Sequence, residues 1–114
     1  MSRIINLCPH DVAIIDRDTE EVIVRFAPEP FTARVIFKTE VIMEVNGVPV
    51  VKSTTGAIRN LPEPEEDTYY IVSSFVAEQA VGRMDLLVPN RIIYSERGQK
   101  VGCEQLLQYW NRNK

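Results

Sequence analysis

The chain has 114 residues, of which 45% are hydrophobic and 25% are charged. This length and apolar content are typical of one globular domain with its own core, so we predict a single domain over residues 1–114. The formal net charge is −3, and no long run of Lys or Arg occurs. Both features argue against a dedicated nucleic-acid binder, because neutralising phosphates requires a clustered basic surface.

The two cysteines, Cys8 and Cys103, bear on the compartment in which the protein works. A disulfide between them would fit a secreted protein, but the first residues lack the apolar segment of a secretory signal peptide. We therefore expect free, buried thiols and a cytoplasmic location. No Cys-x-x-Cys pair or Cys/His spacing indicates zinc, and the apolar runs are too short for a membrane-spanning helix. We accordingly expect no metal, no cofactor and no membrane as partner.

The first part of the chain predicts three strands in a meander. Arg3–Leu7 and Val12–Ile15 are short apolar runs on either side of a Pro-His-Asp turn. Glu20–Phe26 alternates between two faces, which is the period of a half-buried strand. Pro28 and Pro30 then break the pattern, because proline fits neither a helix interior nor a central strand.

The middle of the chain contains the strongest local signal, Asn46-Gly47. This pair separates runs rich in β-branched residues and is the preferred loop of a type I′ hairpin. We predict strands over Thr32–Phe37 and Val41–Val45 before this turn. Ser53–Gly56 predicts a further turn, and the acidic, proline-bearing segment 62–67 predicts an exposed loop.

The last part of the chain adds strands and helices. Thr68–Val72 predicts a buried strand, and Ser73 or Ser74 is a suitable N-cap for a helix over Phe75–Val81. We also expect strands at Leu86–Val88, Ile92–Tyr94 and Gln99–Cys103, and a terminal helix at Glu104–Trp110. Many short strands, frequent turns and one or two short helices predict a mainly β fold, a small barrel or sandwich of short antiparallel strands.

His10 is the only histidine, so any histidine-based acid–base chemistry must use it. It lies between Cys8 and Asp11, which suggests a catalytic pair. However, adjacent residues in a tight turn rarely face one another, and Cys-His dyads are usually distant in sequence. In the alternative, the imidazole hydrogen-bonds the backbone of the turn.

Two further places could bind an anion. The planar guanidinium of Arg83 suits a carboxylate or phosphate; in the alternative, Arg83 pairs with Asp85 and fixes the corner between helix and strand. Ser73 and Ser74 lie where a strand meets a helix, and helix N-termini bind anions; in the alternative they serve only as caps. The candidate ligand-binding residues are therefore His10, Ser73, Ser74, Arg83 and Asp85. Other arginines in or beside strands could join such a site: Arg25, Arg34, Arg59 and Arg91.

Two blocks of residues stand out as motifs. One is Ile5-Asn6-Leu7-Cys8-Pro9-His10-Asp11-Val12; the other comprises Tyr70–Ser73, Val76-Ala77, Arg83–Pro89, Gly98 and Val101–Cys103. Together they resemble a group of small phage, prophage and actinobacterial proteins of unknown function, which begin Asn-Leu-Thr-Pro-His. Cys8 stands where that group usually has threonine, and residues 17–60 contribute little to the resemblance. The resemblance implies a phage-type accessory protein, a class that often sequesters a host signalling molecule or caps a host protein.

Three functions are weighed. The first is a non-catalytic binding protein, expected to be a homo-oligomer, that sequesters an anionic, nucleotide-derived signal of host defence. The second is a protein–protein inhibitor or assembly module that binds a host or phage protein through an edge strand or exposed loops. The third is a small hydrolase or lyase that uses His10. Since the sequence has neither a nucleophile elbow nor a metal motif, we favour binding over catalysis.

Overall fold

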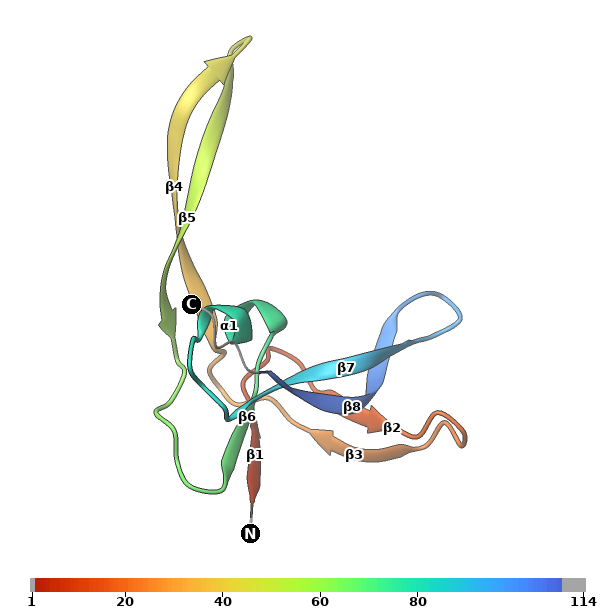
Figure 1. Cartoon of the computed structure of the whole chain (residues 1–114). Helices are drawn as coiled ribbons and strands as arrows, with labels where there is room; N and C mark the ends of the chain where they lie inside the picture. Colours follow the sequence, from red (N-terminus) through yellow and green to blue (C-terminus); the bar gives the residue numbers. More distant parts are fainter. Residues whose placement is uncertain (1, 110–114) are drawn as a thin grey trace.

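The computed structural model describes residues 2–109, which form eight strands and one helix (Figure 1). The strands are β1 (Arg3–Asn6), β2 (Val12–Ile15), β3 (Val22–Phe26), β4 (Arg34–Val45), β5 (Val48–Arg59), β6 (Thr68–Ile71), β7 (Leu86–Tyr94) and β8 (Lys100–Tyr109), and the helix is α1 (Ser74–Gln79). Six strands form one sheet, whereas β4 and β5 form a separate hairpin. The prediction of a mainly β fold with a short helix is therefore confirmed.

The six-stranded sheet has the order β1-β6-β7-β8-β2-β3 and mixes two pairing directions. The β2–β3 and β7–β8 pairs are antiparallel, as predicted, whereas β1–β6, β6–β7 and β2–β8 are parallel. The predicted meander is wrong for β1, which pairs with β6 and not with β2. The reason is that the chain does not leave β1 through a tight hairpin turn. Instead, Leu7 and Cys8 enter two different hydrophobic clusters.

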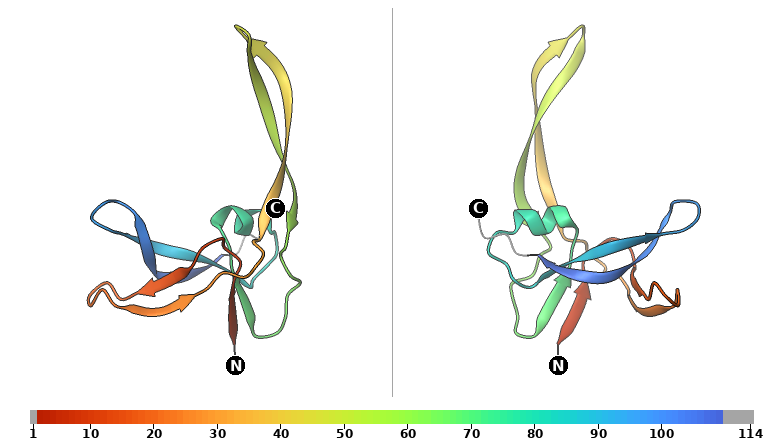
Figure 2. Two further views of the ribbon diagram at one scale, coloured as in Figure 1. Left: turned by 180° about the vertical axis from the view of Figure 1, so that it is seen from behind. Right: turned by 45° about the vertical axis from the view of Figure 1, so that its right-hand side comes forward.

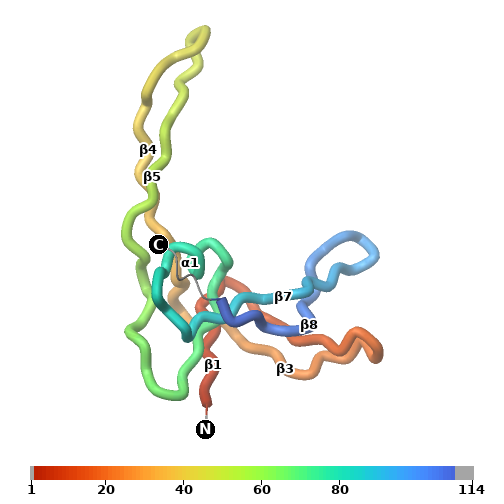
Figure 3. The backbone as a smooth tube through the Cα atoms, viewed as in Figure 1, coloured from red at the N-terminus to blue at the C-terminus, as the bar shows by residue number. Residues whose placement is uncertain are grey.

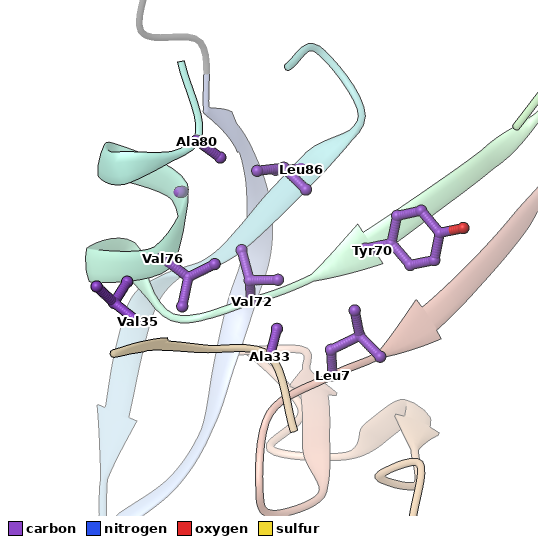
Figure 4. Close-up of a cluster of buried hydrophobic side chains, with 9 residues drawn as sticks. Leu7, Ala33, Val35, Tyr70, Val72, Val76, Ala80 and Leu86 are labelled. Carbon is purple, nitrogen blue, oxygen red and sulfur yellow. The ribbon is translucent and has the colours of Figure 1, made fainter. Parts of the chain in front are cut away.

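The larger hydrophobic cluster lies between α1, β6, β7 and the start of β4 (Figure 4). Helix α1 begins at the predicted place, because the Ser73 hydroxyl oxygen accepts a hydrogen bond from the Val76 amide at 3.2 Å. The helix buries Val76 and Ala77, while Ala80 follows its last residue and is also buried. These side chains pack against buried residues of the strands and their connections: Leu7, Ala33, Val35, Tyr70, Val72 and Leu86. This packing, rather than helix length, holds a six-residue helix in place.

The hairpin of β4 and β5 extends away from the rest of the molecule (Figures 1, 2 and 3), and we call residues 34–59 the arm. Each strand of the arm has 12 residues. At its turn, Asn46 and Gly47 have φ angles of 51° and 81°. A type I′ turn requires positive φ at both positions, so the predicted hairpin is confirmed.

The turn predicted at Ser53–Gly56 is wrong. These residues continue β5, where Thr55 pairs with Phe37 and Thr54 with Lys38. Polar, β-branched threonines suit a strand that is exposed to solvent, and the cross-strand pairing takes up backbone groups that a turn would have left free. The strands expected at Thr32–Phe37 and Val41–Val45 likewise form one continuous strand, β4.

The end of the described chain also differs from the prediction. Leu86–Tyr94 is one continuous strand through Pro89 and Asn90, and β8 continues to Tyr109 where a helix was expected. Trp110, the last residue of that expected helix, lies outside the described residues. The apolar spacing in so short a segment does not distinguish a helix from a strand. Here the segment is a strand because it pairs antiparallel with β7.

Candidate functional site

One groove of about 890 Å³ lies where the segment before β2 meets the start of α1, the middle of β7 and the start of β8. This volume is within the range of small-molecule sites, which is roughly 300–1,000 Å³. Its lining combines apolar and polar residues: Cys8, Pro9, His10, Asp11, Val12, Ala13, Arg25, Ser73, Ser74, Val88, Pro89, Ile92, Lys100, Val101, Gly102 and Cys103. The groove therefore brings together three of the five predicted ligand-binding residues, His10, Ser73 and Ser74.

Asn6 organises the segment that forms one wall of the groove. Its buried side-chain amide donates to the His10 carbonyl at 2.8 Å and to the Phe26 carbonyl at 2.9 Å. Its side-chain oxygen accepts from the Cys8 amide at 2.9 Å. Three hydrogen bonds from one buried residue thus fix both ends of the turn and tie it to β3, so the wall is preorganised.

His10 lies on the exposed outer part of this turn. Its Nδ1 is 3.0 Å from the Asp11 carbonyl oxygen. Because a carbonyl oxygen only accepts, Nδ1 carries the hydrogen in this contact and Nε2 is the nitrogen available to a ligand. The predicted hydrogen bond to the turn backbone is therefore present, and it orients the ring without occupying both nitrogens.

Two cationic side chains, Arg25 and Lys100, also line the groove. Arg25 of β3 is 3.7 Å from the Asp11 carboxylate, and the two side chains are 53% and 47% exposed. An exposed pair at this distance is weak, so Arg25 keeps most of its capacity to bind another anion. Lys100, the first residue of β8, is exposed and also lines the groove. Of the arginines considered from the sequence, Arg25 is the one found in this lining.

Ser73 and Ser74 are two exposed residues of the groove lining. The Ser73 hydroxyl oxygen already caps the Val76 amide, so its hydroxyl hydrogen is the group that remains for a ligand. Helix α1 has only six residues, and the macrodipole of so short a helix is small. The expected anion site at a helix N-terminus is therefore reduced to the two hydroxyl groups.

Cys8 and Cys103 are both free and buried, as predicted, and belong to one hydrophobic cluster beneath the groove with Val12 and Ile71. Burial raises the pKa of the Cys8 thiol to about 11, and burial also raises the pKa of the Cys103 thiol. Both sulfurs lie near backbone carbonyl oxygens, Cys8 at 3.9 Å from Ile71 and Cys103 at 3.7 Å from Ala13. At neutral pH these thiols are protonated, so neither is an activated nucleophile for His10.

Arg83 and Asp85, the other two predicted ligand-binding residues, are not in the groove lining. The Arg83 guanidinium donates to both Asp85 carboxylate oxygens, at 2.8 and 2.7 Å, and to the Pro62 carbonyl at 3.0 Å. The side chains are only 17% and 14% exposed, and the hydrogen bond to Asp85 raises the pKa of Arg83. The geometry is that of the alternative reading, an ion pair that fixes the corner before β7 and ties it to the loop after β5.

Sequence reasoning missed Asn6 and Lys100 as parts of this site. A polar residue inside the apolar run of β1 was the available signal for Asn6, since a buried amide needs partners. Nothing in the sequence indicated that Lys100 would line the groove. Its position there depends on the parallel β2–β8 pairing, which joins distant parts of the chain.

Comparison of the chain with models of known protein families gave no match, and comparisons with curated proteins and with solved structures gave none either. Within residues 2–109, no three His, Cys, Asp or Glu side chains are grouped so that they could hold a metal ion. In the same part of the chain, the structure contains no helix of the length and apolar character needed to cross a bilayer.

Proposed function

We propose that this chain is a non-catalytic binding protein that holds an anionic small molecule in the groove. The observation that carries the proposal is the convergence there of Arg25, Lys100, His10 and the Ser73-Ser74 pair, which come from four separate parts of the chain. Arginine and lysine side chains with hydroxyl groups form a recurring set for phosphate recognition. A phage-type accessory role, the sequestering of a nucleotide-derived signal of host defence, is the form of this function that we favour.

The two parts of the lining suit the two parts of a nucleotide. Val12, Ile92 and Val101 offer apolar surface for a base, while Arg25 and Lys100 offer charge for phosphate oxygens. Specific small-molecule sites generally combine an apolar wall with a few placed polar groups in this way. His10 can donate or accept through Nε2, depending on its protonation.

The state of the residues around His10 favours binding over turnover. The nearby thiols are buried and protonated, and the Nδ1 contact of His10 is to a backbone carbonyl and not to a carboxylate that would orient it as a base. The Asp11 carboxylate instead lies nearest to Arg25. A hydrolase or lyase would need a nucleophile or base arrangement that these contacts do not supply.

Calorimetric titration with cyclic dinucleotides and ADP-ribose derivatives tests the proposal. We expect saturable binding that weakens by about tenfold or more in Arg25→Gln and in Lys100→Gln, because a charge-assisted hydrogen bond contributes about 1.5–3 kcal/mol. Arg97→Gln is the matched control, since Arg97 is an exposed arginine in a turn outside the groove. No heat with any of these nucleotides, or equal losses in Arg97→Gln and Arg25→Gln, would reject this form of the proposal.

A second candidate function is a protein–protein module, favoured by the exposed apolar side chains of the arm. In this case a stoichiometric host or phage protein should co-purify with the chain, and nucleotides should leave its melting temperature unchanged. Loss of that protein from Val48→Lys, but not from Arg25→Gln, would assign the contact to the arm.

A further inference from the structure

Both strands of the arm have a free edge. Among residues 2–109, β4 and β5 pair only with each other, so the outer edge of each strand presents backbone N–H and C=O groups that no third strand pairs with. Figures 1 and 2 show that the arm stands away from the six-stranded sheet. An isolated two-stranded hairpin is marginally stable in water, and natural edge strands are usually short, bent or covered. A long free edge therefore indicates that a further strand pairs with it.

The two edges differ in how well they can accept another strand. In β5, Pro49 has no N–H to donate, and the register shift between Val35 and Phe37 places an extra residue in this strand. From Phe37 to Val41, in contrast, β4 pairs with β5 residue for residue, and the shift between Val41 and Met43 ends this regular stretch. All five of its residues are exposed. This stretch of β4 is therefore the edge that another strand can join.

The segment from Phe37 to Val41 is chemically symmetric about Thr39. Lys38 precedes Thr39 and Glu40 follows it, so opposite charges lie one position away on either side. The apolar residues Phe37 and Val41 lie two positions away and are 51% and 60% exposed. Neither Lys38 nor Glu40 belongs to an ion pair among residues 2–109. A segment with this symmetry is complementary to a second copy of itself that runs in the opposite direction.

Antiparallel pairing of two β4 edges, with Thr39 opposite Thr39, satisfies this complementarity in register. Residues at equal distances on the two sides of Thr39 are then directly opposite, and they share a face because they are an even number of positions apart. Each Lys38 meets Glu40 of the second copy on one face of the sheet. Each Phe37 meets Val41 of the second copy on the other face. Opposite charges, and aromatic with β-branched residues, are favourable cross-strand pairs.

We infer that two copies of this chain dimerise by joining the outer edges of β4 antiparallel, about a two-fold axis at Thr39, so that the two arms form one four-stranded sheet. The symmetric order of the side chains selects a second copy, because an unrelated protein would require no such symmetry in this strand. A two-fold axis needs only this one self-complementary surface. The inference is independent of the groove, so failure of ligand binding would leave it intact, and failure to dimerise would leave the proposed binding function intact.

Cysteine cross-linking tests the position of the two-fold axis. In the dimer the two Thr39 residues are direct cross-strand partners, so Thr39→Cys should form a disulfide-linked dimer when oxidised glutathione is added, as read on a non-reducing gel. Ser53→Cys is the matched control, because Ser53 lies opposite Thr39 on β5 and is also exposed. The two Ser53 residues would be three strand spacings apart, about 14 Å, which a disulfide cannot span. No linked dimer in Thr39→Cys, or equal linking of the two variants, would overturn the inference.

Sedimentation velocity over a wide range of protein concentrations tests the charge pairing. We expect a reversible wild-type dimer whose dissociation constant rises by about tenfold in Lys38→Glu and in Glu40→Lys, because each change turns two attractive cross-strand pairs into repulsive ones. Arg97→Glu is the control for Lys38→Glu, since it changes the net charge equally and lies in a turn outside the arm. Circular dichroism verifies that the variants are folded.

Mixing the two charge variants separates cross-strand pairing from a loss of folding. An equimolar mixture of Lys38→Glu and Glu40→Lys should form a heterodimer at least as tight as the wild-type dimer, because both charge pairs across the two-fold axis are attractive again. A wild-type chain that stays monomeric, an equal loss in Arg97→Glu, or a mixture no tighter than its components would overturn the inference.

Discussion

The side-chain amide of Asn6 donates one hydrogen bond to the His10 carbonyl and a second to the Phe26 carbonyl. This residue therefore couples the turn that carries His10 to Phe26 at the end of β3, where the neighbouring Arg25 lies 3.7 Å from the Asp11 carboxylate. The wall of the candidate site depends on one buried amide.

Substitution Asn6→Ala should destabilise the protein by about 2–4 kcal/mol, because it removes three hydrogen bonds to the backbone, one of them buried and two partly buried. Urea denaturation measures the change in the free energy of unfolding. Gln108→Ala is the control, since Gln108 makes one exposed hydrogen bond to the Met84 carbonyl and should cost about 0.5 kcal/mol or less. Equal costs in the two variants would contradict the role assigned to Asn6.

Gly102 of β8 leaves no room for a side chain beside β2. A Cβ atom there would lie 2.5 Å from Cδ1 of Ile15 and 2.8 Å from the Ala13 carbonyl oxygen. Gly102→Ala should therefore cost about 1–3 kcal/mol of stability. The added variant Ile15→Val removes the Cδ1 atom and should recover part of this loss, while the backbone oxygen retains the rest. A neutral Gly102→Ala would show that β2 and β8 separate without cost.

Breaking the Arg83–Asp85 pair should destabilise the corner before β7. Each alanine variant should cost about 1–3 kcal/mol, and the double variant should cost less than their sum, because the second substitution removes a charge that the first has left unpaired. Thermal or chemical unfolding of the four proteins gives the coupling energy. The exposed Arg17–Glu104 pair is the comparison, and Arg17→Ala should change stability by about 0.5 kcal/mol or less.

Stability should fall as the pH rises from about 9 to about 11. The pKa of Cys8 is raised by burial, so the folded protein holds this proton when the unfolded chain has lost it, and the stabilisation present below pH 9 disappears as the pH passes the folded value. Ionisation of this thiol should lower the free energy of unfolding by about 1–3 kcal/mol over this pH range. Denaturation of wild type and Cys8→Ala at a series of pH values measures it. Parallel curves for the two proteins would contradict the assignment to Cys8.

The sequence predicted those elements whose signals are local. Asn46-Gly47 specifies its turn through positive φ angles, and Ser73 specifies the start of α1 through one hydrogen bond. Ser53–Gly56 misled because the same small polar residues fit an exposed strand once a partner is present. The groove was harder to predict, because parallel pairings between distant segments bring its residues together. Arg83 was wrongly expected there, because its guanidinium is hydrogen-bonded to Asp85, two positions away.

The strand order also constrains how the protein can fold during synthesis. Within the sheet, β1 reaches its neighbours only through β6, and β2 and β3 reach theirs only through β8. During synthesis, β2 and β3 therefore cannot join the sheet until β8, the last strand of the described chain, has been made. The arm, in contrast, can form as soon as both of its strands have been made. During that interval the chain exposes both an unfinished sheet edge and an apolar hairpin, so a chaperone that shields nascent β-rich chains should raise its yield.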